Sequence, residues 1–199
     1  MSSSSVEEQV LSLLNSQDSP ASIAQSLRPL TSDKANAILS FIRSSQSSLS
    51  QDAVVSILKE IPSSELEDLG MSIRSAWNGE LKDNTVDEWT QLNAFVARIN
   101  QAQISNFDLY AIWAFRPSLE ASPYSTDRVP AAKAWILYSG ARLWQLSRDK
   151  TGLGRAARGG ERWKGFEGYN KERWQLWKDA FKELGEEEVV KRMTDFESA

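Results

Sequence analysis

The chain has 199 residues, a formal net charge of −4, 41% hydrophobic residues and 25% charged residues, values typical of a globular protein with a sizeable core. It contains no histidine and no cysteine, which excludes a Ser-His-Asp triad, a Cys-His pair, an ordinary zinc site and a disulfide framework. The acidic balance argues against nucleic-acid binding, and no apolar run is long enough to span a membrane. Because the polar start Met1–Ser5 does not resemble a secretory or transit leader, we expect a cytoplasmic protein.

The first part of the chain predicts short amphipathic helices. Ser5 is a candidate cap, Ser19-Pro20 places a cap before a proline at the first helical position, and Ser64 with Glu67 has the spacing of a capping box. Apolar residues recur at helical spacing between these signals. The predicted helices cover residues 5–14, 19–27, 32–42, 50–61 and 64–77.

The second part predicts longer and more buried helices. Thr85 and Glu88 form another capping box, and apolar side chains wrap most of the segment 107–116, which Pro117 should kink or end. Small residues in 131–147 let neighbouring helices approach closely. Further helices are predicted over residues 85–103, 170–185 and 186–196. The fold class is therefore all-α, an irregular bundle of about eight to ten helices whose central pair is 107–116 and 131–147.

The composition of the chain changes near residue 76. Residues 1–76 hold 21 of the 28 serines and a single aromatic residue, Phe41, whereas residues 77–199 hold the other 18 aromatics and all eight tryptophans. Since aromatic side chains dominate core burial, we expect a serine-rich N-terminal part, residues 1–76, packed on a tryptophan-rich helical core, residues 77–199. Together they are expected to form one structural domain.

A glycine-rich segment, residues 151–168, precedes the helix predicted from residue 170. Five basic residues and one acidic residue lie between Lys150 and Lys164. The spacing of a nucleotide-binding phosphate loop is absent. We interpret the segment as a solvated, flexible loop; an anion-binding or lid role is the alternative.

Aromatic side chains on the central helices are the candidate binding site. Such a cluster with a few polar groups is the usual form of a small-molecule pocket, although aromatics at helical spacing also form ordinary cores. The candidate substrate-binding residues are Tyr110, Trp113, Trp135, Trp144, Trp174 and Trp177. The candidates for polarising a carbonyl or holding a carboxylate are Arg116, Tyr138, Arg142 and Arg173.

Four segments carry a resemblance to a known family: Trp89–Arg98, Ala114–Glu120, Val129–Ile136 and Glu172–Trp177. They resemble, in the same order, a family of small fungal proteins catalogued as a domain of unknown function, and the similarity covers about residues 77–196. Some members are encoded beside natural-product biosynthetic genes. The resemblance carries no catalytic residues with it, but it favours a small-molecule enzyme by association.

We therefore expect a cofactor-independent cyclase or isomerase, such as a pericyclase of the Diels-Alderase kind, in fungal natural-product biosynthesis. It would need no cofactor and no metal, and its substrate would be an apolar small molecule carrying a carbonyl or carboxylate. Shape and a few hydrogen bonds would supply the acceleration. The alternative is a non-catalytic interaction module or small-molecule carrier. Neither nucleic acid nor membrane is an expected partner, and a homodimer is left open.

Overall fold

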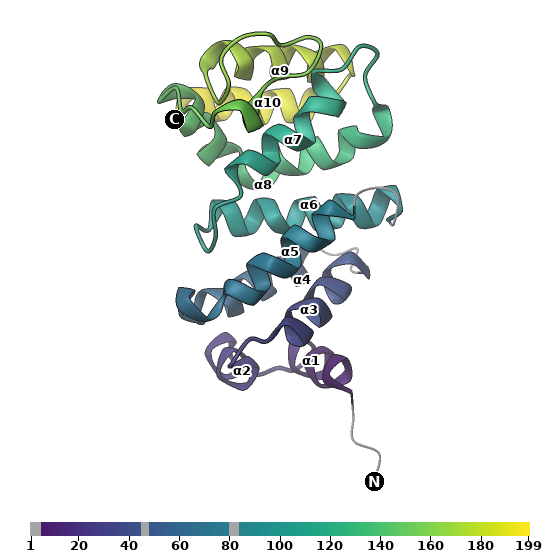
Figure 1. Cartoon of the computed structure of the whole chain (residues 1–199), viewed down its shortest axis with the longest axis vertical. Helices are drawn as coiled ribbons and strands as arrows, with labels where there is room; N and C mark the ends of the chain where they lie inside the picture. Colours follow the sequence, from purple (N-terminus) through teal and green to yellow (C-terminus); the bar gives the residue numbers. More distant parts are fainter. Residues whose placement is uncertain (1–4, 45–47, 80–83) are drawn as a thin grey trace. The chain divides into compact units, whose positions relative to one another are not determined.

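The computed structural model describes residues 5–44, 48–79 and 84–199, and that part of the chain contains ten α-helices. The predicted all-α fold is confirmed: within these residues the only pairing of extended backbone is an isolated antiparallel bridge between Gly152 and Gly168. The helices divide into two compact units, residues 1–105 and residues 106–199 (Figure 1). None of the described helices combines the length and apolar character needed to cross a membrane.

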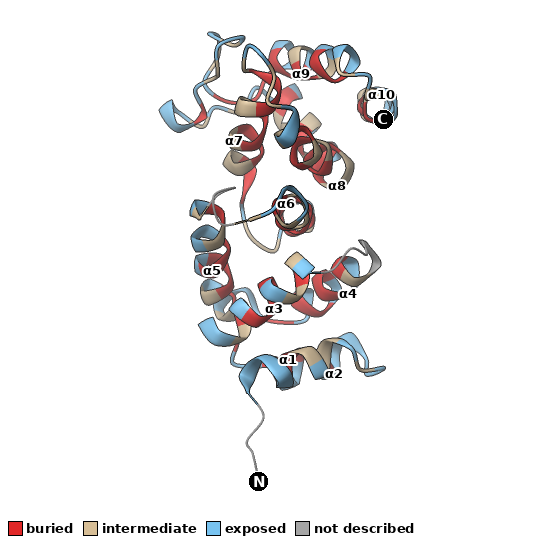
Figure 2. Cartoon of the chain, turned by 90° about the vertical axis from the view of Figure 1, so that its right-hand side faces the viewer, coloured by how far each residue is buried: buried red, intermediate tan, exposed pale blue. Residues whose placement is uncertain are grey.

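The N-terminal unit is organised around α3. This helix packs against α1, α5 and α6, while α4 packs against α2 and α6. Ile38 and Ile42 on α3 are fully buried in this core, and the buried faces of these helices are red in Figure 2. The unit comprises α1 (Val6–Leu14), α2 (Pro20–Leu27), α3 (Ser32–Ser44), α4 (Ser48–Lys59), α5 (Glu67–Asn78) and α6 (Val86–Gln101).

Three of the predicted helix starts in this unit are confirmed by their caps. The side chains of Ser5 and Thr85 each close a capping box, and Ser19 accepts a hydrogen bond at the start of α2. The capping box predicted at Ser64 is wrong. A short 3₁₀ turn occupies Ser63–Glu65, and α5 begins only at Glu67, so this glutamate is the first residue of the helix and cannot reach back as the third.

The change in composition near residue 76 does not coincide with the division between the units. The first unit extends to Ser105 and includes α6. The two tryptophans of this unit, Trp77 on α5 and Trp89 on α6, pack with ring centroids 4.6 Å apart. Part of the aromatic-rich sequence therefore builds the core of the N-terminal unit.

The C-terminal unit is organised around α8, which packs against α7, α9 and α10. The expected central pair, α7 with α8, is thus present. Gly140 on α8 allows a close approach, because an added Cβ would lie 2.3 Å from the ring of Phe196 on α10. Helix α7 does not end at Pro117 but continues one turn to Leu119. The elements are α7 (Asp108–Leu119), η3 (Thr126–Arg128), α8 (Val129–Arg148), η4 (Arg155–Ala157), α9 (Lys171–Glu183) and α10 (Glu187–Ser198).

Candidate functional site

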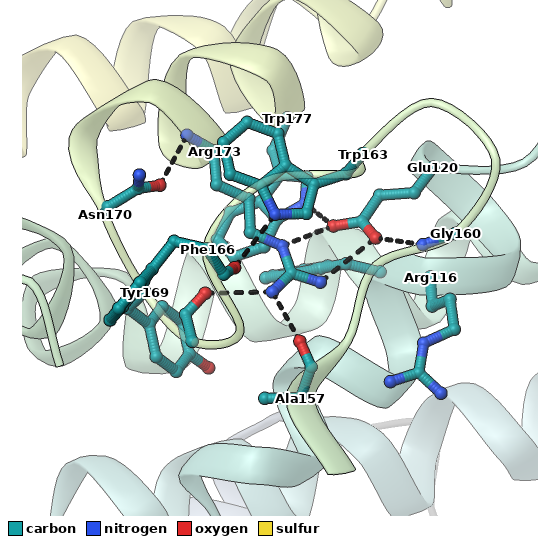
Figure 3. A network of polar contacts seen from close by, with 12 residues as sticks. Arg116, Glu120, Ala157, Gly160, Trp163, Phe166, Tyr169, Asn170, Arg173 and Trp177 are labelled. Carbon is teal, nitrogen blue, oxygen red and sulfur yellow. Dashed lines mark hydrogen bonds and ion pairs between the residues drawn. The ribbon is translucent and has the colours of Figure 1, made fainter. Parts of the chain in front are cut away.

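A buried ion pair between Arg173 and Glu120 lies at the centre of the C-terminal unit (Figure 3). Arg173 is in the first turn of α9, and Glu120 follows the last residue of α7. Arg173 Nε donates to Glu120 Oε1 over 2.7 Å, Nη2 donates to Oε2 over 3.1 Å, and both side chains are 0% exposed. Charges removed from water in this way are tolerated only when paired and hydrogen-bonded.

The two side chains of the pair also form hydrogen bonds with the glycine-rich segment and with Trp177 on α9. Arg173 Nη1 donates to the carbonyl oxygens of Ala157 and Gly168, at 2.8 and 2.9 Å. The Glu120 carboxylate accepts from the backbone N–H of Gly160 at 2.8 Å and from the indole N–H of Trp177 at 2.7 Å. Figure 3 shows these bonds converging on one guanidinium and one carboxylate. We call this network the Arg173–Glu120 clamp.

The clamp bears on the interpretation of residues 151–168 as a solvated, flexible loop, because most of these residues are exposed, as expected, but their backbone is held at several points. Besides the clamp bonds, the segment is closed at its base, where Leu153 N donates to Glu167 O and Tyr169 N donates to Thr151 O. Gly160 lies so near Glu120 that an added Cβ would be 2.7 Å from its carbonyl oxygen. Exposed basic side chains suggested solvation, but the backbone of the segment is fixed by contacts distant in sequence.

A second ion pair joins Arg142 on α8 to Asp108, the first residue of α7. Arg142 donates to both carboxylate oxygens of Asp108 over 2.7 Å, and this hydrogen bonding raises the pKa of Arg142. The hydroxyl of Tyr169, fully buried, donates to the backbone carbonyl of Asp108 at 2.6 Å. Burial, followed by the negative charge of Asp108, raises the pKa of Tyr169 well above its ordinary value. This arrangement links α7, α8 and the end of the glycine-rich segment.

Arg116 differs from the other two candidate arginines. Its Nη2 donates to the carbonyl of Ala156 at 2.8 Å, and the indole N–H of Trp113 donates to the same oxygen at 2.9 Å. Its Nε is enclosed and has no hydrogen-bond partner among the described residues. Burial, with repulsion from Arg173 and Arg158, lowers the pKa of Arg116 despite the attraction of Glu120. Figure 3 shows its guanidinium turned away from Glu120.

The predicted aromatic residues form separate pairs. Tyr110 lies against Trp113 with ring centroids 4.9 Å apart, and Trp144 lies against Trp174 at 5.4 Å. Trp177 packs on Phe115 at 4.6 Å and lies beside the Arg173 guanidinium. Trp135, Trp174 and Trp177 are almost completely buried, whereas Tyr110, Trp113, Tyr138 and Trp144 are partly exposed.

These positions limit the chemistry that the candidate residues can perform. Arg173 and Arg142 already hold carboxylates of the protein, and the three buried tryptophans serve as core. Arg116 and Tyr138 have partly exposed side chains that a ligand could reach. Among the residues that the structure describes, no three acidic side chains are grouped to hold a metal ion.

Sequence reasoning missed the partners of the arginines. Glu120, Asp108, Gly160 and Tyr169 are not among the predicted site residues. Their separations explain this, because Glu120 lies 53 residues from Arg173 and Asp108 lies 34 residues from Arg142. The one available signal was the i, i+4 spacing of Arg173 and Trp177, which buries the arginine with the tryptophan.

Comparison with known proteins identifies a family for most of the chain. Residues 22–181 match the profile of a family described as a protein of unknown function, DUF3632. No curated protein and no solved structure matches the chain. The expected resemblance to a family defined as a domain of unknown function is confirmed to this extent.

Proposed function

The chain belongs to the DUF3632 family, and we propose that it is a non-catalytic interaction module whose C-terminal unit binds an acidic segment of a partner protein. One observation carries this proposal: arginines without carboxylate partners lie beside paired aromatic side chains on an anchored part of the backbone. We call this region the arginine–aromatic surface. It consists of Tyr110, Trp113, Arg116, Arg155 and Arg158.

The arginines of this surface form no ion pair with a carboxylate among the described residues. Arg155 is the first residue of the turn η4 and Arg158 follows its last residue; both are exposed, and neither makes an ion pair with a carboxylate in the described part of the chain. Arg116 bonds the carbonyl of Ala156, between them in sequence. The carboxylate of Glu120 is held by Arg173. A negatively charged partner would supply the missing counter-charge.

The residue types favour a protein as the partner. Tryptophan, tyrosine and arginine are enriched among the residues that contribute most to protein–protein affinity. Here Tyr110 and Trp113 pack on each other, and Trp113 shares its backbone acceptor with Arg116.

The anchoring of η4 would lower the cost of binding. The carbonyl of Ala156 accepts from Trp113 and Arg116, and the carbonyl of Ala157 accepts from the buried Arg173. A surface already held in one conformation loses less conformational entropy when a partner docks. The clamp thus fixes the backbone at Ala157, next to Arg158 of this surface.

Fluorescence anisotropy with a labelled oligoglutamate peptide tests the proposal on the full chain. The variant Arg155→Glu/Arg158→Glu should weaken binding at least about tenfold, equivalent to about 1.4 kcal/mol. Lys171→Glu is the matched control for each reversal, because Lys171 is an exposed cation in the first turn of α9, and it should change affinity less than about twofold. Equal losses in both variants would refute the proposed surface, and so would tighter binding of a single-stranded oligonucleotide than of the peptide.

The fungal cofactor-independent cyclase expected from the resemblance remains a separate proposal. Of its four polarising candidates, Arg142 and Arg173 are held by protein carboxylates. That proposal now rests on Arg116 and Tyr138, with Trp113 beside Arg116 as the apolar wall. Candidate polyene carboxylic acids incubated with the full chain should cyclise faster than in buffer, and Arg116→Ala should abolish the difference. Turnover that survives in Arg116→Ala/Tyr138→Phe would remove the remaining support for these residues.

A further inference from the structure

We propose that the N-terminal unit contains an independent binding site for a small zwitterionic metabolite, with Arg43 receiving its carboxylate and Glu88 receiving its ammonium group. The site is a cavity of about 580 Å³ between α3, α5 and the start of α6. It lies within one unit and shares no residue with the arginine–aromatic surface. Its lining residues are Asn36, Leu39, Ser40, Arg43, Ser44, Ser72, Ser75, Ala76, Gly79, Asn84 and Glu88.

Eight of the eleven lining residues are polar, which favours a ligand with polar groups over the apolar substrate expected for the C-terminal unit. The side chains of Ser72, Ser75 and Asn36 make no hydrogen bond within the described part of the chain. Ser72 is also largely buried, so its hydroxyl faces the cavity without full access to water. Buried polar groups generally have hydrogen-bond partners, and a ligand with hydroxyl or amide groups would provide them.

Arg43 supplies a positive charge at this cavity, where its attraction is also one of the causes that lower the pKa of Glu88. It lies in the last turn of α3. Its Nε is enclosed by protein yet has no hydrogen-bond partner, and the side chain forms no ion pair among the described residues. Leaving an enclosed charged donor unpaired is costly. A carboxylate in the cavity can meet the Nη groups of this partly exposed guanidinium, which presents two parallel N–H groups, and its charge compensates the cation.

Glu88 supplies the complementary negative charge. Its Oε2 accepts from the backbone N–H and the hydroxyl of Thr85, at 2.8 and 2.9 Å, so the capping box fixes the carboxylate at the start of α6. These bonds to Thr85, the backbone bond first, lower the pKa of Glu88 and keep it ionised. The other oxygen, Oε1, accepts no hydrogen bond within the described residues. It is available to an ammonium group.

The separation of the two charges determines the class of ligand. Arg43 and Glu88 line the same cavity but do not approach within the 4.0 Å of an ion pair. A ligand carrying both a carboxylate and an ammonium group can bridge them, whereas a simple anion leaves Glu88 unpaired. The cavity volume falls in the range of small-molecule sites and accommodates a short peptide or an amino-acid derivative.

Calorimetry with the dipeptide seryl-serine, its N-acetyl form and its C-terminal amide tests this assignment on the full chain. Seryl-serine should bind saturably, and each modification should weaken binding about tenfold, because it leaves one protein charge unpaired. Arg43→Gln should bind the amide as well as the parent peptide. Glu88→Gln should bind the N-acetyl form as well as the parent, and it keeps the capping box, since glutamine serves at that position.

Lys59→Gln is the matched control, because Lys59 is also a basic residue in the last turn of a helix of this unit. It should leave all three affinities unchanged, and circular dichroism should show the same helix content in every variant. Absence of heat with millimolar seryl-serine would overturn the proposal, as would equal binding of the three peptides to the unmodified chain. The oligoglutamate assay uses different residues, so either site can fail while the other is retained.

Discussion

Replacement of Glu120 by glutamine tests whether the clamp holds the C-terminal unit together. Glu120→Gln keeps the size of the side chain but removes the only carboxylate among the described residues that bonds to Arg173, which stays charged because arginine does not lose its proton in proteins. Both side chains are 0% exposed, so water cannot replace the lost charge. Breaking a buried pair in this way costs about 3–5 kcal/mol, a large part of the 5–15 kcal/mol that typically stabilises a protein.

Urea unfolding followed by tryptophan fluorescence measures this loss, and hydrogen exchange of the α7 and α9 amides assigns it to the C-terminal unit. The matched control is Glu183→Gln, because Glu183 is an exposed carboxylate that contacts Arg162 at 3.3 Å. The control should change the free energy of unfolding by about 1 kcal/mol or less. If Glu120→Gln costs no more than this control, the argument that the clamp is essential is wrong.

A double replacement separates charge from backbone anchoring. In Glu120→Leu/Arg173→Leu no charge is left unpaired, and exchanges of this kind are often neutral. Here, however, the carbonyls of Ala157 and Gly168 and the N–H of Gly160 would lose their partners. Each unsatisfied buried group costs about 1–3 kcal/mol, so the double variant should remain destabilised. Recovery of the original stability would show that these backbone bonds contribute little.

Three further substitutions probe the same unit, each measured by urea unfolding. Tyr169→Phe should lower the free energy of unfolding by about 1 kcal/mol at neutral pH. It should also flatten the alkaline loss of stability, because burial raises the pKa of Tyr169, so that its contribution is complete below the unfolded-state pKa of about 10 and is lost as the pH rises above that value. An unchanged alkaline slope would contradict this. Gly160→Ala should cost about 1–3 kcal/mol, because the added Cβ clashes with the carbonyl of Glu120. The helical control Gly70→Ala meets only the movable end of the Arg74 side chain and should be neutral or stabilising. Equal effects of the two substitutions would remove the steric argument. Asn170→Ala should cost about 0.5–2 kcal/mol, because its side chain caps α9, and no loss would mean that the clamp alone fixes this helix start.

The helices were largely predictable because their signals are local. The caps at Ser5, Thr85 and Asn170 lie within three residues of the backbone N–H groups they satisfy, and periodicity located the buried faces. The prediction failed at Ser64, where local spacing agreed with a capping box but a 3₁₀ turn after Pro62 used the same residues. Of the two outcomes predicted at Pro117, a kink or an end, the end is wrong, since α7 continues to Leu119 beside α8 and α9.

The candidate site was predictable only in part, because residue type does not state which partner a side chain meets. The sequence selected Arg116, Arg142 and Arg173 as a group. The structure shows that the last two are bonded to carboxylates far away in the chain, and no local pattern indicates such pairings. The conformation of the glycine-rich segment was missed for the same reason, since Glu120 and Arg173 on neighbouring elements fix it.

A physical criterion therefore separates structural from ligand-binding arginines in this chain: whether the protein itself supplies the counter-charge. Arg173 shares a helix face with Trp177, so burial of that face removes the arginine from water and requires Glu120 nearby. Arg43 and Arg116 have an enclosed Nε without a partner, and no carboxylate forms an ion pair with either in the described residues. The fold gains less from these two charges than from Arg173, since each leaves a donor unsatisfied. An external anion would satisfy both, which is why the two proposed binding sites are placed at these arginines.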